Sequence, residues 1–549
     1  MTRIIPGVQI TVVKEVVPPQ LAPSGIFGLV GLVAPAREGT IRQPVERVGS
    51  WARFRELYGR GTARVMPEAQ QAFQNGIFEL VVVDLESAVA DAASVTLDSG
   101  GAYLSFSARA AGTRPNGLEL SLANLGNGYE LRLREGGDDI EVYRNLSVLP
   151  GDSSYIGRVL DGSDSEVQLD APTVAYTDFS GAGATVAAGG TQQLATVATA
   201  AVLTVSVASG AASSLVITEV AIGGDTNIRF TYDGNTLFDL DTTSDTPFDG
   251  FRTAIEAIDE LSVSTTRPDA SGTLAGGVDA STAEYVDALT LLEDVADVDL
   301  VSVALQDHGD VDNDRATTIY SAIISHCQQM SGEAMGRIGF GQVSPAAPAP
   351  AGAGDTDLLD TNMADLLRSD RFVLLAPYGA LGATVGRIGG LTYYLSPTFK
   401  TLSGLGDFQP ALRVEQQRAY LQQNMVPIAQ VPGRGVAVVR GLTTDGDQIN
   451  VRRIADRAVR GVRLIGELFI GKLNTEDGRN ALKQKLTEFL LQMQSENAIV
   501  PSTDGSDPAF QLDVYSTQAD FAQGIVRIDL AVRPVRAIDF IYATVLVQV

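Results

Sequence analysis

Short segments in which apolar and polar residues alternate dominate the middle of the chain, between residues 88 and 272. The pattern is carried by LELSLAN, YELRLRE, SEVQLD, AVLTVSV, SLVITEVAI and NIRFTYD, with Gly, Asp and Ser between them. A period of two is typical of strands that bury one face. We therefore predict a β-rich inserted domain at residues 88–171 and an additional β-rich outer insertion at residues 172–272.

On either side of this region, helical patterns alternate with apolar runs typical of buried strands. Residues 21–87 contain GIFGLVGLVA, SWARFRELYG and AQQAFQNGIFELVVVDL, which predict a strand, a helix and a helix–strand unit. Residues 273–409 show the same alternation of helical patterns and apolar runs, and we expect the α/β core to resume there. Residues 410–535 predict helices at 451–466 and 477–497 with a short strand between them, and then a further strand. The fold class expected is an α/β (α+β) core in discontinuous domains, with a β-rich insertion.

Both ends of the chain have the pattern of a single strand, and we predict linking arms at residues 1–20 and 536–549. The apolar positions that define the two arm strands are Val8, Ile10, Val12, Tyr542, Val545 and Val547. A lone terminal strand is an exposed edge unless it pairs. It either adds to a sheet of a neighbouring subunit or pairs within its own chain, and the pattern leaves both open.

Charge is distributed unevenly along the chain, whose formal net charge is -26. Residues 88–272 hold 25 acidic residues against 9 arginines and no lysine, whereas residues 410–549 hold 16 basic against 15 acidic residues. The acidic middle argues against nucleic-acid binding and for an outward, solvated surface. The nearly neutral C-terminal region is free to face an acidic partner.

One uncharged stretch, residues 180–218, could be mistaken for a membrane span. It is rich in Gly, Ser, Thr and Gln and alternates around LTVSVAS, so we predict strands there and no membrane span. The first residues contain no continuous apolar segment, and we expect no Sec signal peptide. The single cysteine, Cys327, excludes an internal disulfide framework and fits a reducing compartment.

The residues that usually carry catalysis are scarce. There are only two histidines, His308 and His326, and no HExxH, CxxC, GxSxG or GxGxxG motif. His326 and Cys327 are adjacent and lie in a helical segment with the periodicity of core packing, so a catalytic pair is not expected. The acidic segments around Asp312 and Asp164 fit a helix start and a turn better than calcium loops. We predict no enzyme, no catalytic residue, no metal site and no cofactor.

The most specific local signal is a cluster of arginines in INVRRIADRAVRGVRLIGEL. At 100° per residue the cluster falls within an arc of about 140°, and its members are Arg452, Arg453, Arg457, Arg460 and Arg463. Apolar residues occupy the opposite face, namely Ile454, Ala458, Val459, Val462 and Ile465. A solvated surface helix is the plain interpretation. Because only Asp456 interrupts the arginine face, we predict that it contacts an acidic protein partner.

At this point the sequence resembles a known family, the contractile tail sheath proteins of phages and phage-derived contractile injection systems. The resemblance runs in order through PGVQITVV, GIFGLVGLVAPAREG, VGSWARFRELYG, AQQAFQNGIFELVVVDL, TLAGGVDASTAEYVDALTLLEDVADVDLV, INVRRIADRAVRGV, GKLNTEDGRNALKQKLTEFLLQMQSENAIV and GIVRIDLAVRPVRAIDFIYATVLV. NGLELSLANLG and EVYRNLSVLPGDSSYIGRVLDGSDSEVQLD resemble the domain that many sheaths insert. Residues 172–272 resemble nothing in the family.

The resemblance implies a structural subunit that polymerises with itself as stacked hexameric rings around an inner tube and contracts to drive the tube through a target envelope. It implies a C-terminal domain that faces the tube, arms that add strands to neighbouring subunits, and baseplate and tail terminator or cap proteins as further partners. Assembly in the bacterial cytoplasm is expected, into a virion tail or a contractile injection particle. The arginine face would then contact the tube or a neighbouring subunit. A sheath of an extracellular or cell-anchored injection system is the near alternative, and a self-assembling surface adhesin the distant one.

Overall fold

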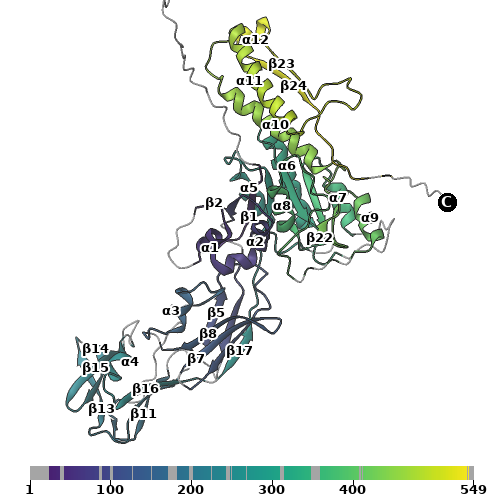
Figure 1. Ribbon diagram of the computed structural model, residues 1–549. Helices are drawn as coiled ribbons and strands as arrows, with labels where there is room; N and C mark the ends of the chain where they lie inside the picture. The colour runs from purple at the N-terminus through teal and green to yellow at the C-terminus, as the bar shows by residue number, and fades with distance from the viewer. Residues whose placement is uncertain are drawn as a thin grey trace, which may run out of the picture.

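The computed structural model describes residues 24–36, 43–85, 90–98, 103–126, 128–149, 151–170, 182–196, 202–223, 225–242, 248, 250–267, 269–309, 314–347, 359–406, 408, 410, 412–540 and 542. Helices and strands are mixed, and the strands form several separate sheets. The described part is elongated: a β-rich region lies at one end, an α/β body in the middle and the C-terminal helices at the other end (Figure 1). The predicted arm at residues 1–20, Val545 and Val547 lie outside the described residues.

The body is built on one eight-stranded sheet. Its strands, in spatial order, are β2 (Val45–Val48), β3 (Glu79–Asp84), β1 (Ile26–Gly31), β18 (Leu300–Val303), β19 (Ile338–Gln342), β20 (Phe372–Ala376), β21 (Val426–Val431) and β22 (Gly435–Val438). The inner strands pair in parallel, and β2 and β22 pair antiparallel at the two edges. Sequence segments before and after the insertion therefore share one sheet. Burial on both faces explains why strands such as β3 read as unbroken apolar runs.

Helices cover both faces of this sheet. One face is packed by α1 (Trp51–Val65), α2 (Pro67–Gln74) and α8 (Leu381–Gly390). The other is packed by α5 (Thr282–Thr290), α6 (Asp314–Gly332), α7 (Leu359–Leu366) and α9 (Val414–Gln422). Cys327 is fully buried in this second layer, and His326 Nε2 lies 2.6 Å from Arg337 Nη1. Both residues therefore serve packing within the body.

The inserted region contains four sheets in two parts. The part next to the body has sheets β4 (Ser94–Asp98)–β5 (Tyr103–Ala108)–β9 (Val167–Leu169) and β17 (Ala270–Thr273)–β6 (Glu119–Asn124)–β7 (Tyr129–Glu135)–β8 (Asp138–Leu146), with helix α3 (Ile156–Asp161). The far part has sheets β10 (Thr185–Val186)–β13 (Leu215–Ile222)–β14 (Asp225–Tyr232)–β15 (Asn235–Asp241) and β11 (Thr191–Thr196)–β12 (Val202–Val207)–β16 (Leu261–Thr266), with helix α4 (Phe251–Ile255). The uncharged stretch thus holds strands, and within the described residues no helix is long and apolar enough to cross a membrane.

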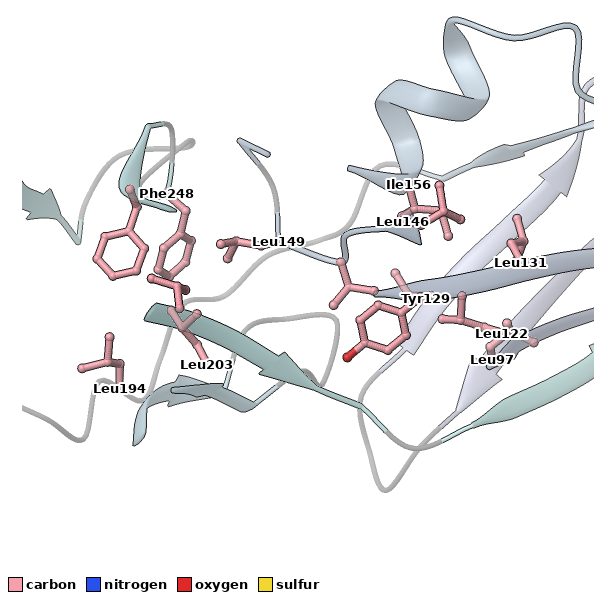
Figure 2. Packing of buried hydrophobic residues seen from close by; sticks show 14 of the residues in the cluster. Leu97, Leu122, Tyr129, Leu131, Leu146, Leu149, Ile156, Leu194, Leu203 and Phe248 are labelled. Carbon is pink, nitrogen blue, oxygen red and sulfur yellow. The ribbon is translucent and has the colours of Figure 1, made fainter. Parts of the chain in front are cut away.

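A continuous set of buried apolar side chains connects the two parts of the insertion (Figure 2). Leu203 and Phe248 lie in the far part, Leu131 and Ile156 in the near part, and Leu149 lies between the two groups. Polar contacts cross the same junction: the Tyr129 hydroxyl donates to Thr265 O at 3.1 Å, and Arg267 Nη2 donates to Leu97 O at 2.7 Å. Strand β17 lies across the predicted boundary at residue 272 and pairs with β6, so the far part is nested inside the near part.

The C-terminal module consists of α10 (Ile449–Glu467), α11 (Glu476–Ser495), β23 (Phe510–Tyr515), α12 (Gln518–Ala522) and β24 (Arg527–Val532). Both predicted helices are present, but the short strand expected between them is wrong, because residues 468–471 form a turn. The predicted boundary at residue 410 also needs correction. Strands β21 and β22 follow that point, and yet β21 pairs in parallel with β20 and extends the body sheet.

Candidate functional site: the arginine face of helix α10

Helix α10 crosses the edge of the body sheet at which the parallel strands begin. The residues that meet it come directly before β18, β19 and β20, around positions 297–299, 336 and 370–371. Its opposite face buries Ile454, Ala458 and Ile465 against α11 and the β23–β24 sheet. Val459, predicted on that apolar face, is 40% exposed. The amphipathic pattern therefore places α10 between two layers of its own chain.

Asp456, the single acid on the arginine face, is buried and organises one end of the contact. Arg371, from the start of β20, donates to both of its carboxylate oxygens at 3.2 and 3.1 Å. Arg452 donates to Asp456 Oδ1 at 2.9 Å and to Asp370 Oδ2 at 2.8 Å. Space is tight as well, because a Cβ on Gly336 would lie 2.3 Å from Asp456 Oδ1. Asp456 therefore ties α10 to the body through two guanidinium groups.

Two further arginines bind main-chain carbonyls of the body. Arg453 Nη1 donates to Ile388 O at 2.7 Å and Leu391 O at 3.3 Å, at the C-terminal end of α8, where a positive charge also complements the helix dipole. Arg460 Nη1 donates to Asp297 O at 3.1 Å, and its Nη2 donates to Val298 O and, at 2.7 Å, to Gly336 O. These carbonyls come directly before β18 and β19, at the edge of the sheet where the parallel strands begin.

Of the remaining two arginines, Arg457 packs on an aromatic ring, and Arg463 bonds one carboxylate of its own helix and one main-chain carbonyl of the body. The guanidinium of Arg457 lies 5.5 Å from the ring centre of Tyr393, whose hydroxyl donates to Glu496 Oε2 at 2.6 Å. Burial and the neighbouring Glu496 carboxylate raise the pKa of Tyr393, so this hydroxyl stays protonated. Arg463 Nε bonds Glu467 Oε1 at 2.9 Å, and its Nη1 donates to Glu333 O at 3.2 Å.

The structure thus brings all five predicted arginines together, but turns them toward their own chain. We expected an outward face, because a helical wheel shows which residues share a side and not what that side meets. The acceptors come from Asp297, Val298, Glu333, Gly336, Asp370, Ile388, Leu391, Asp456 and Glu467, and the Tyr393 ring receives Arg457. The only usable signal for this arrangement was Asp456, the one acid in a basic face.

A second arginine-rich contact, which sequence reasoning missed, joins the insertion to the body. On helix α1, Arg55 bonds Asp164, and Arg64 Nε bonds Glu166 while its Nη1 bonds Glu135 Oε1 at 3.1 Å. The predicted turn around Asp164 therefore has a defined partner within the chain. Nearby, Arg114 Nη2 lies 2.8 Å from buried Glu68 Oε1, and Arg114 Nη1 donates to Val65 O at 2.6 Å. The acids of the insertion are thus used in part to fix its orientation on the body.

The body contains no group of three or more His, Cys, Asp or Glu side chains placed to hold a metal ion, as far as the described residues extend. Burial lowers the pKa of both His308 and His326 to about 4, with nearby arginines adding to the effect. Burial raises the pKa of the Cys327 thiol to about 12. Both imidazoles are therefore neutral and the thiol is protonated at neutral pH, as expected of packing residues.

Comparison with known proteins connects this site to a family. Residues 443–548 match the family model of the phage tail sheath C-terminal domain, so the chain carries a domain of this class. The matched region contains α10 with its five arginines, α11 and the β23–β24 sheet. The resemblance to tail sheath proteins that the sequence indicated is thereby confirmed for residues 443–548. No curated protein matches the chain in sequence.

Three solved structures with a loosely similar course of the chain are described as sheath proteins. The sheath tail protein from Desulfitobacterium hafniense is 15% identical, with 97% of each chain covered and a TM-score of 0.45. The sheath tail protein from Listeria innocua is 11% identical, with 94% of this chain and 93% of that chain covered and a TM-score of 0.44. The contracted helical sheath of the anti-feeding prophage is 12% identical, with 99% of each chain covered and a TM-score of 0.46. Scores at this level describe a loose likeness and carry no functional conclusion.

Proposed function

We propose that this chain is the structural subunit of a contractile sheath. In this proposal, subunits stack as hexameric rings around an inner tube and contract to drive the tube through a target envelope. The observation that carries the proposal is the match of residues 443–548 to the phage tail sheath C-terminal domain. No nucleotide or cofactor is required, because the energy is stored in the packing between subunits and released when the array moves to a better-packed state.

The architecture supports a subunit that moves as one body. The arginine face holds the C-terminal module against the sheet edge, and the α1 arginines hold the insertion against the body. The acidic insertion projects from the body, as Figure 1 shows, which suits a solvated outer surface on a large polymer. The C-terminal module would face the tube at the other end. Contraction would then change contacts between subunits while each subunit keeps its shape.

The predicted linking arms remain part of the proposal. Residues 1–20 and 536–549 would add strands to neighbouring subunits. The β23–β24 sheet suits such addition, since no third strand joins it among the described residues and main-chain hydrogen bonding at its edges is open. The described start of the C-terminal arm bonds to its own chain, because Ala537 N–H donates to Gln448 Oε1 at 2.8 Å and Arg440 Nε donates to Asp539 Oδ2 at 2.8 Å. Tyr542, further along, is 94% exposed.

The partners proposed are other copies of this chain, the inner tube protein, and the baseplate and terminator or cap proteins. A contact of Arg452, Arg453, Arg457, Arg460 and Arg463 with the tube or a neighbouring subunit stays a prediction. Their contacts within the chain indicate a first role in holding the module in place. Arg463, with 34% of its side chain exposed, has more room for an additional partner than Arg452, at 22%, or Arg453, at 4%.

The direct test is to express the full chain alone and examine it by negative-stain electron microscopy. Striated hollow tubes are expected, and deleting residues 1–20 or the last ten residues should abolish them while leaving folded subunits. Co-expression with an inner tube protein is the second arm, because assembly could require a template. Subunits that stay single in both arms would refute the sheath proposal.

A sheath of an extracellular or cell-anchored injection system is equally compatible with the domain match. A virion tail and an injection system would use the same kind of sheath subunit and would differ in the other proteins of the particle. Genes for a capsid and terminase beside this one would identify a virion tail. Genes for an AAA ATPase and toxin cargo would identify an injection particle. In either case we expect assembly in the bacterial cytoplasm.

A further inference from the structure

The insertion meets the body through a polar junction. Its buried apolar side chains form one cluster, to which the body contributes none. The chain enters the insertion at residues 91–94 and leaves it at residues 275–278, and these two passages, the stem, pair through main-chain hydrogen bonds of 2.8 and 3.0 Å between Ser94 and Ala275. The apolar clusters of the body take up three small side chains of the insertion, namely Ala90, Ala110 and Ala111. A polar interface joined by a narrow stem permits the two parts to move relative to each other.

One contact anchors the insertion beside its stem. Arg114 Nη2 lies 2.8 Å from Glu68 Oε1, and Arg114 Nη1 donates to Val65 O, at the end of α1, at 2.6 Å. The two charged side chains are nearly buried, with 15% and 4% of their surface exposed. Asn116, close by in the chain, exchanges hydrogen bonds of 2.9 Å with Gly277 of the stem. Because salt screens a buried pair far less than an exposed one, this anchor keeps its strength at high ionic strength.

A second contact ties the insertion to the same helix nearer its start. The carboxylate of Asp164 bonds Arg55 and accepts from the main-chain N–H of Arg60 at 2.7 Å. That N–H is available because α1 departs from helical geometry at Gly59, with φ of 68° and ψ of -166°. A Cβ at Gly59 would lie 2.6 Å from Asp164 Oδ1, so glycine permits the close approach as well as the bend. The helix is thus shaped to receive this one carboxylate.

The contact at Asp164 is open to solvent. Arg55 and Asp164 have 31% and 29% of their side chains exposed, and exposed ion pairs are weak and are screened by salt. Between this contact and the anchor, Arg64 bonds Glu166 and Glu135, of which Glu135 is 59% exposed. Burial raises the pKa of Glu166, and Arg64 offsets this only in part, so the junction stabilises the Glu166 carboxylate less well than water does. Ionic strength can therefore release the contacts made by α1.

We propose that Asp164 and Arg55 form a salt-sensitive latch between the insertion and the body. With the latch closed, the insertion keeps the orientation that Figure 1 shows. When salt screens the exposed pair, Asp164 leaves α1 and the insertion turns about the Arg114–Glu68 anchor and the stem, which stay in place. The result is a hinge that reorients a folded domain without unfolding it. The latch belongs to the single chain and is independent of whether the subunit forms a sheath.

The single tryptophan, Trp51, reports on the latch directly. The guanidinium of Arg55 lies 6.0 Å from the centre of the Trp51 ring, so a change in the position of Arg55 alters the surroundings of the indole. The separation of insertion and body is measured by energy transfer from Trp51 to a dye on Arg158→Cys, an exposed position on α3. The dye attaches there alone, because Cys327 is fully buried.

The labelled full chain is titrated with NaCl from about 0.1 M to about 1 M, over which the Debye length falls from about 10 Å to about 3 Å. Energy transfer should fall as α3 moves away from α1, and the emission of Trp51 should shift, while the far-ultraviolet circular dichroism stays unchanged. Repeating the titration at a lower chain concentration separates transfer within one chain from transfer between copies. Constant energy transfer across the titration would overturn the proposal.

Three variants, each made in the labelled chain, assign the effect to the latch. Asp164→Asn removes the charge and keeps an acceptor for the main chain, so at about 0.1 M NaCl it should already show the low energy transfer that the chain with Asp164 reaches near about 1 M. Glu135→Gln, at a more exposed position, should shift the titration in the same direction by less, and it serves if Asp164→Asn does not fold. Glu56→Gln is the matched control, because Glu56 pairs with Arg53 on α1 itself, at 2.9 Å. Equal titration curves for the control and for the variants at Asp164 and Glu135 would contradict the latch.

Discussion

Replacing Asp456 by Asn should loosen the C-terminal module from the body. The carboxylate is 6% exposed and is shared by Arg371 and Arg452. Asn has almost the same size, so the close approach of Gly336 is preserved and only the charge and one acceptor are lost. The perturbation therefore isolates electrostatics from packing.

The expected loss of stability depends on which acceptors Arg371 and Arg452 still have after the substitution. Breaking a buried ion pair by removing one partner costs about 3–5 kcal/mol. The remaining amide oxygen still accepts one hydrogen bond from a charged donor, which is worth about 1.5 kcal/mol. Arg452 keeps Asp370, whereas Arg371 loses the only carboxylate that it contacts among the described residues. We therefore expect a loss of about 2–3 kcal/mol in the free energy that holds the module in its folded, docked state.

Urea denaturation followed by two probes measures this loss. Circular dichroism reports all helices, whereas the single tryptophan, Trp51, lies in α1 and reports the body alone. In Asp456→Asn the circular dichroism transition should move to lower urea and separate from the Trp51 transition, as expected when two units no longer unfold together.

Asp370→Asn is the matched control, because Asp370 bonds the same Arg452 but has half of its side chain exposed. It should cost less than about 1 kcal/mol, as exposed pairs do. Replacing Arg371 and Asp456 together by Met should restore most of the stability, since no charge is then left unpaired. Equal losses in Asp456→Asn and Asp370→Asn would refute the role given to the buried carboxylate.

Three further predictions concern the body and the C-terminal helices. Gly461→Ala should lower the free energy of unfolding by about 1–2 kcal/mol, measured by urea denaturation. The new Cβ would lie 2.2 Å from the Phe489 ring, and this overpacking outweighs the gain in helix propensity of about 1 kcal/mol. The free energy of unfolding should fall from pH 7 to pH 5 by up to about 2 kcal/mol for each histidine. In the unfolded chain a histidine takes up a proton near pH 6.5, whereas in the folded chain the pKa values of His308 and His326 are lowered to about 4. In the double variant H308N/H326N the free energy of unfolding should depend less steeply on pH. Cys327, fully buried and with its pKa raised to about 12, should not react with a thiol reagent such as DTNB until the chain unfolds, and reaction of the native chain at the rate of a free thiol would contradict the packing described.

Much of the local structure could be predicted from the sequence because it follows from local periodicity. Alternation gave β6, β7, β12, β13 and β14, and the 3.6-residue pattern gave α10 and α11 within two residues at each end. The turn after α10 cannot be recognised from the sequence, because its apolar residues have the composition of a short strand. Leu468, Ile470 and Leu473 are instead exposed, at 43%, 82% and 82%. Apolar content alone does not distinguish a strand from a turn.

For the candidate site, too, one part follows from local periodicity and another part depends on the fold. That five arginines share one face of a helix can be read from the amino-acid order, since this needs only the geometry of an α-helix. Which groups that face contacts depends on how distant segments fold against it. The acceptors are carbonyls and carboxylates at the start of strands β18, β19 and β20 and at the end of α8, up to 163 positions away in sequence. No pattern in the helix encodes them, because main-chain carbonyls are the same at every residue and become a binding surface only when a parallel sheet lines up the starts of its strands.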